Sequence, residues 1–157
     1  IAKIEKKFMA TREKIEAARA KEPKNPQVLY ALARFYDDYA FTGILDPEIE
    51  KSNRERAIAT YKSFLQQDPN NAEAWVSIGR LLFRNEQWED AAEWFKHAME
   101  RGWKVKNMIL WYFEALYRQG DFRTLRRAVH EHGRGIVNQE ELPQPIRDAV
   151  ALWQQAA

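Results

Sequence analysis

The sequence offers few side chains that could perform catalysis or hold a metal ion. His130 and His132 stand two positions apart in HEHGRG. On a helix this spacing points two side chains away from each other, and no third ligand is evident, so we expect a structural or solvent-facing role. The acidic run of Asp46, Glu48 and Glu50 lacks the alternating ligands and central glycine of a calcium loop. We expect a solvated turn there.

Enzyme motifs are absent from the sequence as well. It contains no glycine-rich phosphate loop, no His-Glu-x-x-His pair and no nucleophile elbow. It also contains no cysteine, which excludes disulfides, thiolate catalysis and thiolate metal ligands. We therefore expect no catalytic residue, no metal site and no cofactor.

The composition is that of a soluble, folded domain. Of 157 residues, 45% are apolar and 31% are charged, and the formal net charge of +2 argues against a generic nucleic-acid binder. No apolar run is long enough to span a bilayer, and we expect a cytoplasmic protein. The chain opens on Ile1 rather than Met, which suggests a fragment. Lys3, Lys6 and Lys7 near that start are typical of a solvated helix face, or of the cytoplasmic side of an upstream membrane anchor.

Two stripes follow one predicted helix in AEAWVSIGRLLFRNEQW, residues 72–88. One is apolar and is expected to face the core: Trp75, Ile78, Leu81 and Leu82. The other mixes aliphatic, aromatic and positive side chains at positions i, i+4, i+7 and i+8: Val76, Arg80, Phe83 and Arg84. We therefore expect the second stripe to have a role other than packing in the core.

An internal repeat explains how such helices are arranged. Residues 75–98 give a helix, a short turn and a second helix, and the same pattern recurs 34 positions later. Earlier in the chain, Leu29 corresponds to Trp75 with an offset of 46, so 12 extra residues interrupt that repeat between Tyr36 and Ala57. Small residues at Ala33, Gly79, Ala57 and Ala91 would let paired helices approach closely while aromatic side chains fill the gaps.

These residues resemble tetratricopeptide repeats, whose pattern is Trp-x2-Leu-Gly-x2-Tyr, then Ala-x3-Phe, then Pro. The match is best over residues 72–105, with Trp75, Ile78, Gly79, Leu82, Ala91, Phe95 and Ala98 in register and Trp103 where the pattern has Pro. The resemblance implies an all-α, right-handed helical-repeat solenoid of about three helix pairs plus flanking helices. We expect a single domain over 1–157, made of a second-helix-like segment at 3–21, repeats at 26–71, 72–105 and 106–135, and a capping helix within 143–157.

The resemblance and the apolar spacing together predict each helix. The pairs are 26–41 with 52–67, 72–84 with 88–101, and 106–118 with 122–132, flanked by helices at 3–21 and 145–155. The insertion, which we place within 37–56, contains AFTGIL, and its apolar Phe41, Ile44 and Leu45 are expected to pack over neighbouring helices, or else to form a lip on a binding groove. The N-terminal helix is expected to dock on the helix from residue 26, with a coiled-coil contact to a second chain as the alternative.

The resemblance also implies a site, because first helices line the concave groove in this family. Carried over residue by residue, the groove would consist of Tyr30, Arg34, Asp37, Val76, Arg80, Phe83, Arg84, Leu110, Glu114, Tyr117 and Arg118. We expect a protein-interaction scaffold whose groove binds a protein or peptide segment with acidic and apolar side chains. In the competing interpretation these Arg residues merely balance Asp37, Asp38 and Glu114 and stack on the aromatics.

A second class of function stays open. The chain could be the soluble part of a membrane-tethered bacterial assembly or secretion subunit, for example in exopolysaccharide export, where such domains occur. In that case the Lys-rich start would matter more than the groove, and the N-terminal helix could mediate oligomerisation.

Overall fold

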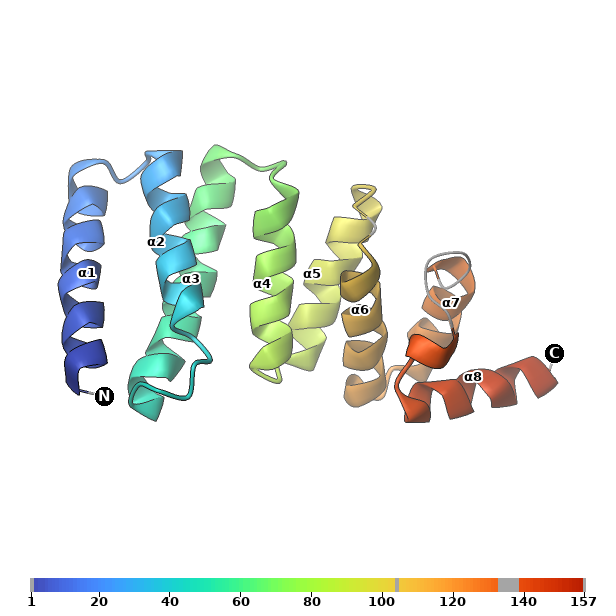
Figure 1. Ribbon diagram of the computed structural model, residues 1–157. Helices are drawn as coiled ribbons and strands as arrows, with labels where there is room; N and C mark the ends of the chain where they lie inside the picture. The colour runs from blue at the N-terminus through green and yellow to red at the C-terminus, as the bar shows by residue number, and fades with distance from the viewer. Residues whose placement is uncertain (1, 104, 133–138, 157) are drawn as a thin grey trace. The chain divides into compact units, whose positions relative to one another are not determined.

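In the computed structural model, the described part of the chain is helical (Figure 1). The structure describes residues 2–103, 105–132 and 139–156, and no strand occurs within them. The elements are α1 (Ala2–Lys21), α2 (Pro26–Asp38), α3 (Pro47–Gln67), α4 (Ala72–Arg84), α5 (Trp88–Glu100), α6 (Lys106–Gln119), α7 (Phe122–His132), a 3-10 turn (Gln139–Glu141) and α8 (Gln144–Ala156). The chain divides into two compact units, residues 1–81 and 82–157, and each is described by itself.

The predicted helices are all present, and most ends agree within one residue. Helices α4 and α7 begin and end as predicted, while α5 ends one residue early and α6 one residue late. Gly120 terminates α6 in the left-handed conformation, at φ 83°, and its N–H donates to the Leu116 and Tyr117 carbonyls. This is the conformation that favours glycine at a helix end. The end of the predicted 106–135 repeat, residues 133–135, lies outside the described residues.

The prediction was wrong around the insertion. Helix α2 ends at Asp38 rather than 41, and α3 begins at Pro47 rather than 52. Asp46 caps α3 by accepting a hydrogen bond from the Glu48 N–H, and Pro47 is suited to the first turn because it has no N–H to satisfy. Part of the insertion therefore lengthens α3, and a short loop remains between α2 and α3.

A buried carboxylate holds that loop against α3. Glu50, expected to be solvated, is 5% exposed and accepts hydrogen bonds from the Thr42 hydroxyl and from the Gly43 and Leu45 N–H groups. Burial by itself would raise the pKa of Glu50, but these hydrogen bonds outweigh it and leave the pKa lowered. The solvated-turn prediction is therefore wrong for Glu50, which fastens the loop.

The apolar residues of the insertion pack in part. Leu45 is buried, Phe41 is half-buried with the Arg54 guanidinium 4.9 Å from its ring centre, and Ile44 is 47% exposed. Packing is thus observed for Leu45 and partly for Phe41, and the expectation fails for Ile44.

In the first unit, α1 docks on α2 as expected. Phe8 is fully buried, with its ring stacked on Phe35 at 5.1 Å and edge-on to Tyr39 at 5.2 Å. The Tyr36 hydroxyl donates to Glu16 of α1 at 2.6 Å. The aromatic contacts fix α1 against the next helix pair. The coiled-coil contact and the upstream tether stay predictions.

Small residues allow close packing between α2 and α3 in this unit. Ala33 and Ala57 are fully buried, as are the large rings of Tyr36 and Tyr61. The alanines leave room for the helix backbones to approach, and the rings fill the space beside them. The pairing with α3 fixes α2 in position, and the side of α2 that does not pack on α3 is left for other contacts.

The second unit has a core of its own. Ala91 and Phe95 of α5 are fully buried, together with Phe113 of α6 and Leu125 of α7. The terminal helix α8 buries Ile146 at 0% exposure and Val150 at 6%, and Trp153 is half-buried, as the predicted apolar stripe requires. Helix α8 packs against α6 and α7 and so covers the end of the unit.

Candidate functional site

The first unit carries a polar and aromatic face on α2 and α4. We call it the unit 1 face and define it by Tyr30, Arg34, Asp37, Val76 and Arg80. The Tyr30 hydroxyl donates to Glu73 Oε2 at 2.8 Å, which joins α2 to α4. Burial first, and then this hydrogen bond, raises the pKa of Tyr30. Glu73 is not among the residues predicted for the groove, although it lies three positions before Val76 on the same side of α4.

Arg80 belongs to a partly buried network rather than to a free binding surface. Its guanidinium forms an ion pair with Asp37 Oδ2, and the buried Tyr61 hydroxyl donates to the same oxygen at 2.9 Å. The side chains of Arg80 and Asp37 are 25% and 10% exposed. Burial and then the Asp37 charge raise the pKa of Tyr61, which stays protonated. For Arg80 the competing interpretation, in which Asp37 balances the charge, describes the observed contact.

Arg34 differs from Arg80. Its side chain is exposed, its guanidinium lies 5.9 Å from the centre of the Tyr30 ring, and no ion pair joins it to a carboxylate of a described residue. Val76 is half-buried beside this polar set. The unit 1 face therefore offers one cation stacked on an aromatic ring and open to an incoming carboxylate.

The second unit carries a face that is mainly aromatic. We call it the unit 2 face and define it by Phe83, Arg84, Leu110, Glu114, Tyr117 and Arg118. Phe83 meets Trp88 edge-on at 5.1 Å and lies 6.2 Å from Trp111. Tyr117 meets Phe122 edge-on at 5.6 Å, Leu110 is half-buried and Arg84 is exposed.

Arg118 has two partners within the unit 2 face. Its guanidinium lies 5.6 Å from the Trp88 ring centre and 3.5 Å from Glu114, four positions earlier on α6. Its side chain is 55% exposed, so this pair is open to solvent. Trp88 and Trp111 were missed as site residues. Trp111 could have been found, since it stands three positions before Glu114 and shares its helix face.

The two histidines of the HEHGRG segment differ in their exposure. His130 is exposed, whereas His132 is half-buried with its Nε2 3.7 Å from Glu131. Within the described ranges, no cluster of three or more His, Cys, Asp or Glu side chains has the geometry to hold a metal ion. In the same ranges, no helix has the length and apolar character needed to cross a membrane.

Comparison with known proteins agrees with this helical pairing. The chain matches no protein in a search of curated sequences. A family model for the tetratricopeptide repeat matches residues 48–104, which run from the first turn of α3 through α4 and α5. The matched segment includes Ala57, Gly79, Ala91 and Phe95, the residues that carried the resemblance. The predicted tetratricopeptide repeat is therefore confirmed, and residues 48–104 of this chain are tetratricopeptide repeat sequence.

Proposed function

We propose that this chain is a protein-interaction module in which the unit 1 face and the unit 2 face, each by itself, bind partner segments that carry acidic and apolar side chains. Tetratricopeptide repeats generally mediate protein–protein interactions, which supports the general class of function. The observation that carries the finer proposal is Arg34, an exposed guanidinium beside the Tyr30 ring with no ion pair among the described residues. Arginine next to an aromatic ring is a frequent energetic centre of protein interfaces.

The second unit supports the apolar part of the proposal. Phe83, Trp88, Trp111 and Tyr117 are all half-buried, so each ring keeps part of its surface open to solvent. Rings that are already held by neighbouring rings lose little side-chain entropy when a partner covers them. Such rings suit aliphatic or aromatic side chains of a bound segment.

The proposal is tested by panning a displayed library of random peptides on the immobilised chain. We expect enrichment of peptides that combine Asp or Glu with apolar residues, and binding that weakens as salt is raised from about 50 to 300 mM. The variant Arg34→Glu should lose most of these peptides. The matched control is Arg126→Glu. Arg126 is also an exposed arginine on a helix, but it belongs to α7, outside both faces.

Arg34→Glu should fold normally, because Arg34 is exposed and forms no ion pair with a described residue. Equal retention of the selected peptides by Arg34→Glu and by the native chain would refute the assignment of Arg34. Enrichment of peptides without acidic residues would refute the proposed partner chemistry.

A further inference from the structure

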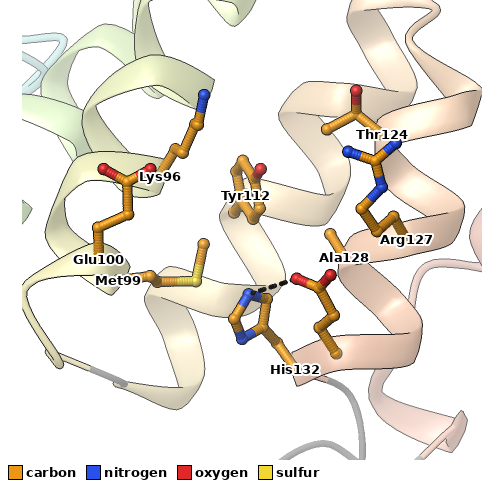
Figure 2. A pocket seen from close by; sticks show the side chains of 9 residues that line it. Lys96, Met99, Glu100, Tyr112, Thr124, Arg127, Ala128 and His132 are labelled. Carbon is orange, nitrogen blue, oxygen red and sulfur yellow. Dashed lines mark ion pairs between the residues drawn. The ribbon is translucent and has the colours of Figure 1, made fainter.

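The helices of this chain follow a regular packing order. In both units a first helix packs between two second helices, since α2 contacts α1 and α3, and α6 contacts α5 and α7. Figure 2 shows one example, in which Tyr112 of α6 lies between Met99 of α5 and Ala128 of α7. These three side chains are 5%, 6% and 4% exposed. A first helix is therefore covered by the second helix before it and by the second helix after it.

The terminal helices have some of these partners and lack others. Helix α1 is a second helix that contacts α2, and no first helix precedes it among the described residues. Helix α8 follows the second helix α7, which is the place of a first helix, and no second helix follows it in the described part of the chain. The partner that α1 lacks is thus a first helix, and the partner that α8 lacks is a second helix.

Burial shows which side of α1 is open. At the repeat spacing, Thr11, Ile15 and Ala18 correspond to six residues of α3 and α5: Ala57, Tyr61, Phe64, Ala91, Phe95 and Ala98. Those six residues are at most 5% exposed, whereas Thr11, Ile15 and Ala18 are half-buried. Ile4, seven positions before Thr11 on the same side, is 39% exposed. We call these four α1 residues the α1 stripe, and it corresponds to the side of α3 that packs on its first helix α2.

Helix α8 has a second apolar side. Ile146 and Val150 are buried, at 0% and 6% exposure, but Leu152 points to a different side and is 64% exposed. Pro145 and Ala149 share the side of Leu152, because they lie seven and three positions before it. We call Pro145, Ala149 and Leu152 the α8 stripe. The outer face of a terminal repeat is ordinarily polar, so an apolar outer stripe indicates further packing.

The two terminal helices match a helix pair within the chain. Helix α8 has 13 residues and α1 has 20, compared with 13 for the first helix α2 and 21 for its second helix α3. The charges beside the two stripes also have opposite signs. Lys7 and Lys14 are exposed beside the α1 stripe, and Asp148 is exposed beside the α8 stripe. In length and in charge, α8 and α1 are therefore suited to each other.

We propose that α8 of one copy of this chain packs on the α1 stripe of a second copy, so that α8 is the first helix and α1 the second helix of a repeat completed between copies. The contact removes Ile4 and Leu152 from water. It joins different surfaces of the two copies, so it can recur from copy to copy, in a closed ring or in an open chain. The proposal goes beyond the proposed function, because Arg34 and the rings of the unit 2 face belong to neither stripe.

Sedimentation velocity of the 157-residue chain tests for self-association. We expect the average mass to rise above that of a monomer as the concentration is raised from about 5 to 500 µM, the range in which weak contacts form. A monomer at every concentration would overturn the proposal and would leave the two stripes to segments of other proteins.

Two variants block one stripe each. Ile4→Glu places a charge in the α1 stripe and Leu152→Lys places one in the α8 stripe. Each should raise the Kd of self-association at least about tenfold, because a charge replaces a large aliphatic side chain that the contact buries. The controls are Met9→Glu, on another side of α1, and Val105→Lys, at the start of α6, where the native side chains are 45% and 50% exposed.

Both controls should associate like the native chain, and far-UV circular dichroism verifies that all four variants keep their helix content. An equal rise in Kd for the controls would overturn the proposal, because the loss would then not depend on the two stripes.

A mixture of the two blocking variants distinguishes this contact from a symmetric one. Ile4→Glu keeps its α8 stripe and Leu152→Lys keeps its α1 stripe, so an equimolar mixture should form pairs with one copy of each and grow no further. Self-association of Leu152→Lys alone at the native Kd would indicate an α1–α1 contact, and that of Ile4→Glu alone would indicate an α8–α8 contact. Either result would overturn the proposal, as would a mixture that associates no better than its components.

Discussion

The contrast between Arg80 and Arg118 leads to a quantitative prediction about stability. Arg80→Ala removes the cation that neutralises Asp37, whose side chain is 10% exposed and would keep the Tyr61 hydroxyl as its remaining partner in the network. Arg118→Ala removes the partner of Glu114, but the Arg118 side chain is 55% exposed and the pair is screened by water. The two substitutions are chemically identical and differ in the burial of the charge that remains.

The expected magnitudes follow from burial. Removing one partner of a fully buried pair costs about 3–5 kcal/mol, and removing a surface partner about 0–1 kcal/mol. Because Arg80 is 25% exposed, its network is intermediate, and we expect Arg80→Ala to lower the free energy of unfolding by about 2 kcal/mol. For a chain of this length that corresponds to a fall in Tm of about 4–8 °C. Arg118→Ala should cost about 0.3–0.5 kcal/mol.

Urea unfolding followed by circular dichroism at 222 nm measures these differences. Adding Asp37→Asn to Arg80→Ala should restore more than half of the lost stability, because the neutral amide carries no charge to desolvate and still accepts from Tyr61. Arg80→Ala costing no more than Arg118→Ala would refute the reasoning. So would a double variant that is less stable than Arg80→Ala, since the penalty would then not arise from the unpaired carboxylate.

Two further predictions concern the first unit. Glu50→Gln should lower the free energy of unfolding at pH 7 by about 1–2 kcal/mol, because hydrogen bonds to a charged acceptor are the stronger ones. Since the folded-state pKa of Glu50 is lowered, its contribution is complete above the unfolded-state pKa and is lost as the pH falls through the folded-state pKa. The difference in the free energy of unfolding between Glu50→Gln and the native chain, measured by urea unfolding, should therefore shrink as the pH falls below about 4. The control, Glu48→Gln at an exposed position, should differ little from the native chain at any pH. A difference for Glu50→Gln that stays constant with pH would refute this prediction. Ala57→Leu should lower the free energy of unfolding, measured in urea, by about 1–3 kcal/mol, because the buried methyl group faces a packed interface. The control, Ala59→Leu at an exposed position, should change it very little. Similar losses for both variants would contradict the close approach of α2 and α3.

Most of the helical pattern was predictable because its determinants are local. Apolar spacing located α4 and α7, and Gly120 marks the end of α6. The start of α3 differs from the prediction, although Asp46 and Pro47 form a recognisable cap, because the repeat spacing alone assigns the whole interval to an insertion. The burial of Glu50 could not be predicted in the same way. It depends on how the loop from Thr42 to Leu45 folds back on α3, and hydrogen bonds to backbone groups leave no mark in the residue pattern.

The candidate faces were predictable as positions and not as contacts. Helical spacing places Arg80 on the exposed side of α4, but Asp37 is 43 positions earlier and Tyr61 belongs to a third helix. The contact of Arg80 and Tyr61 with the Asp37 carboxylate depends on how the three helices pack, and helical periodicity does not encode this packing.

Arg34 and Arg80 show why counting arginines on a repeat face does not measure its capacity to bind. They occupy equivalent positions in successive repeats, 46 residues apart, like Leu29 and Trp75. Arg80 meets Asp37 of the preceding first helix and becomes part of the structure. Arg34 instead lies over the Tyr30 ring, with its guanidinium 5.9 Å from the ring centre, and forms no ion pair with a carboxylate of a described residue. The equivalent position thus supports packing in one repeat and can support recognition in the other, and the difference is set by the neighbouring carboxylates.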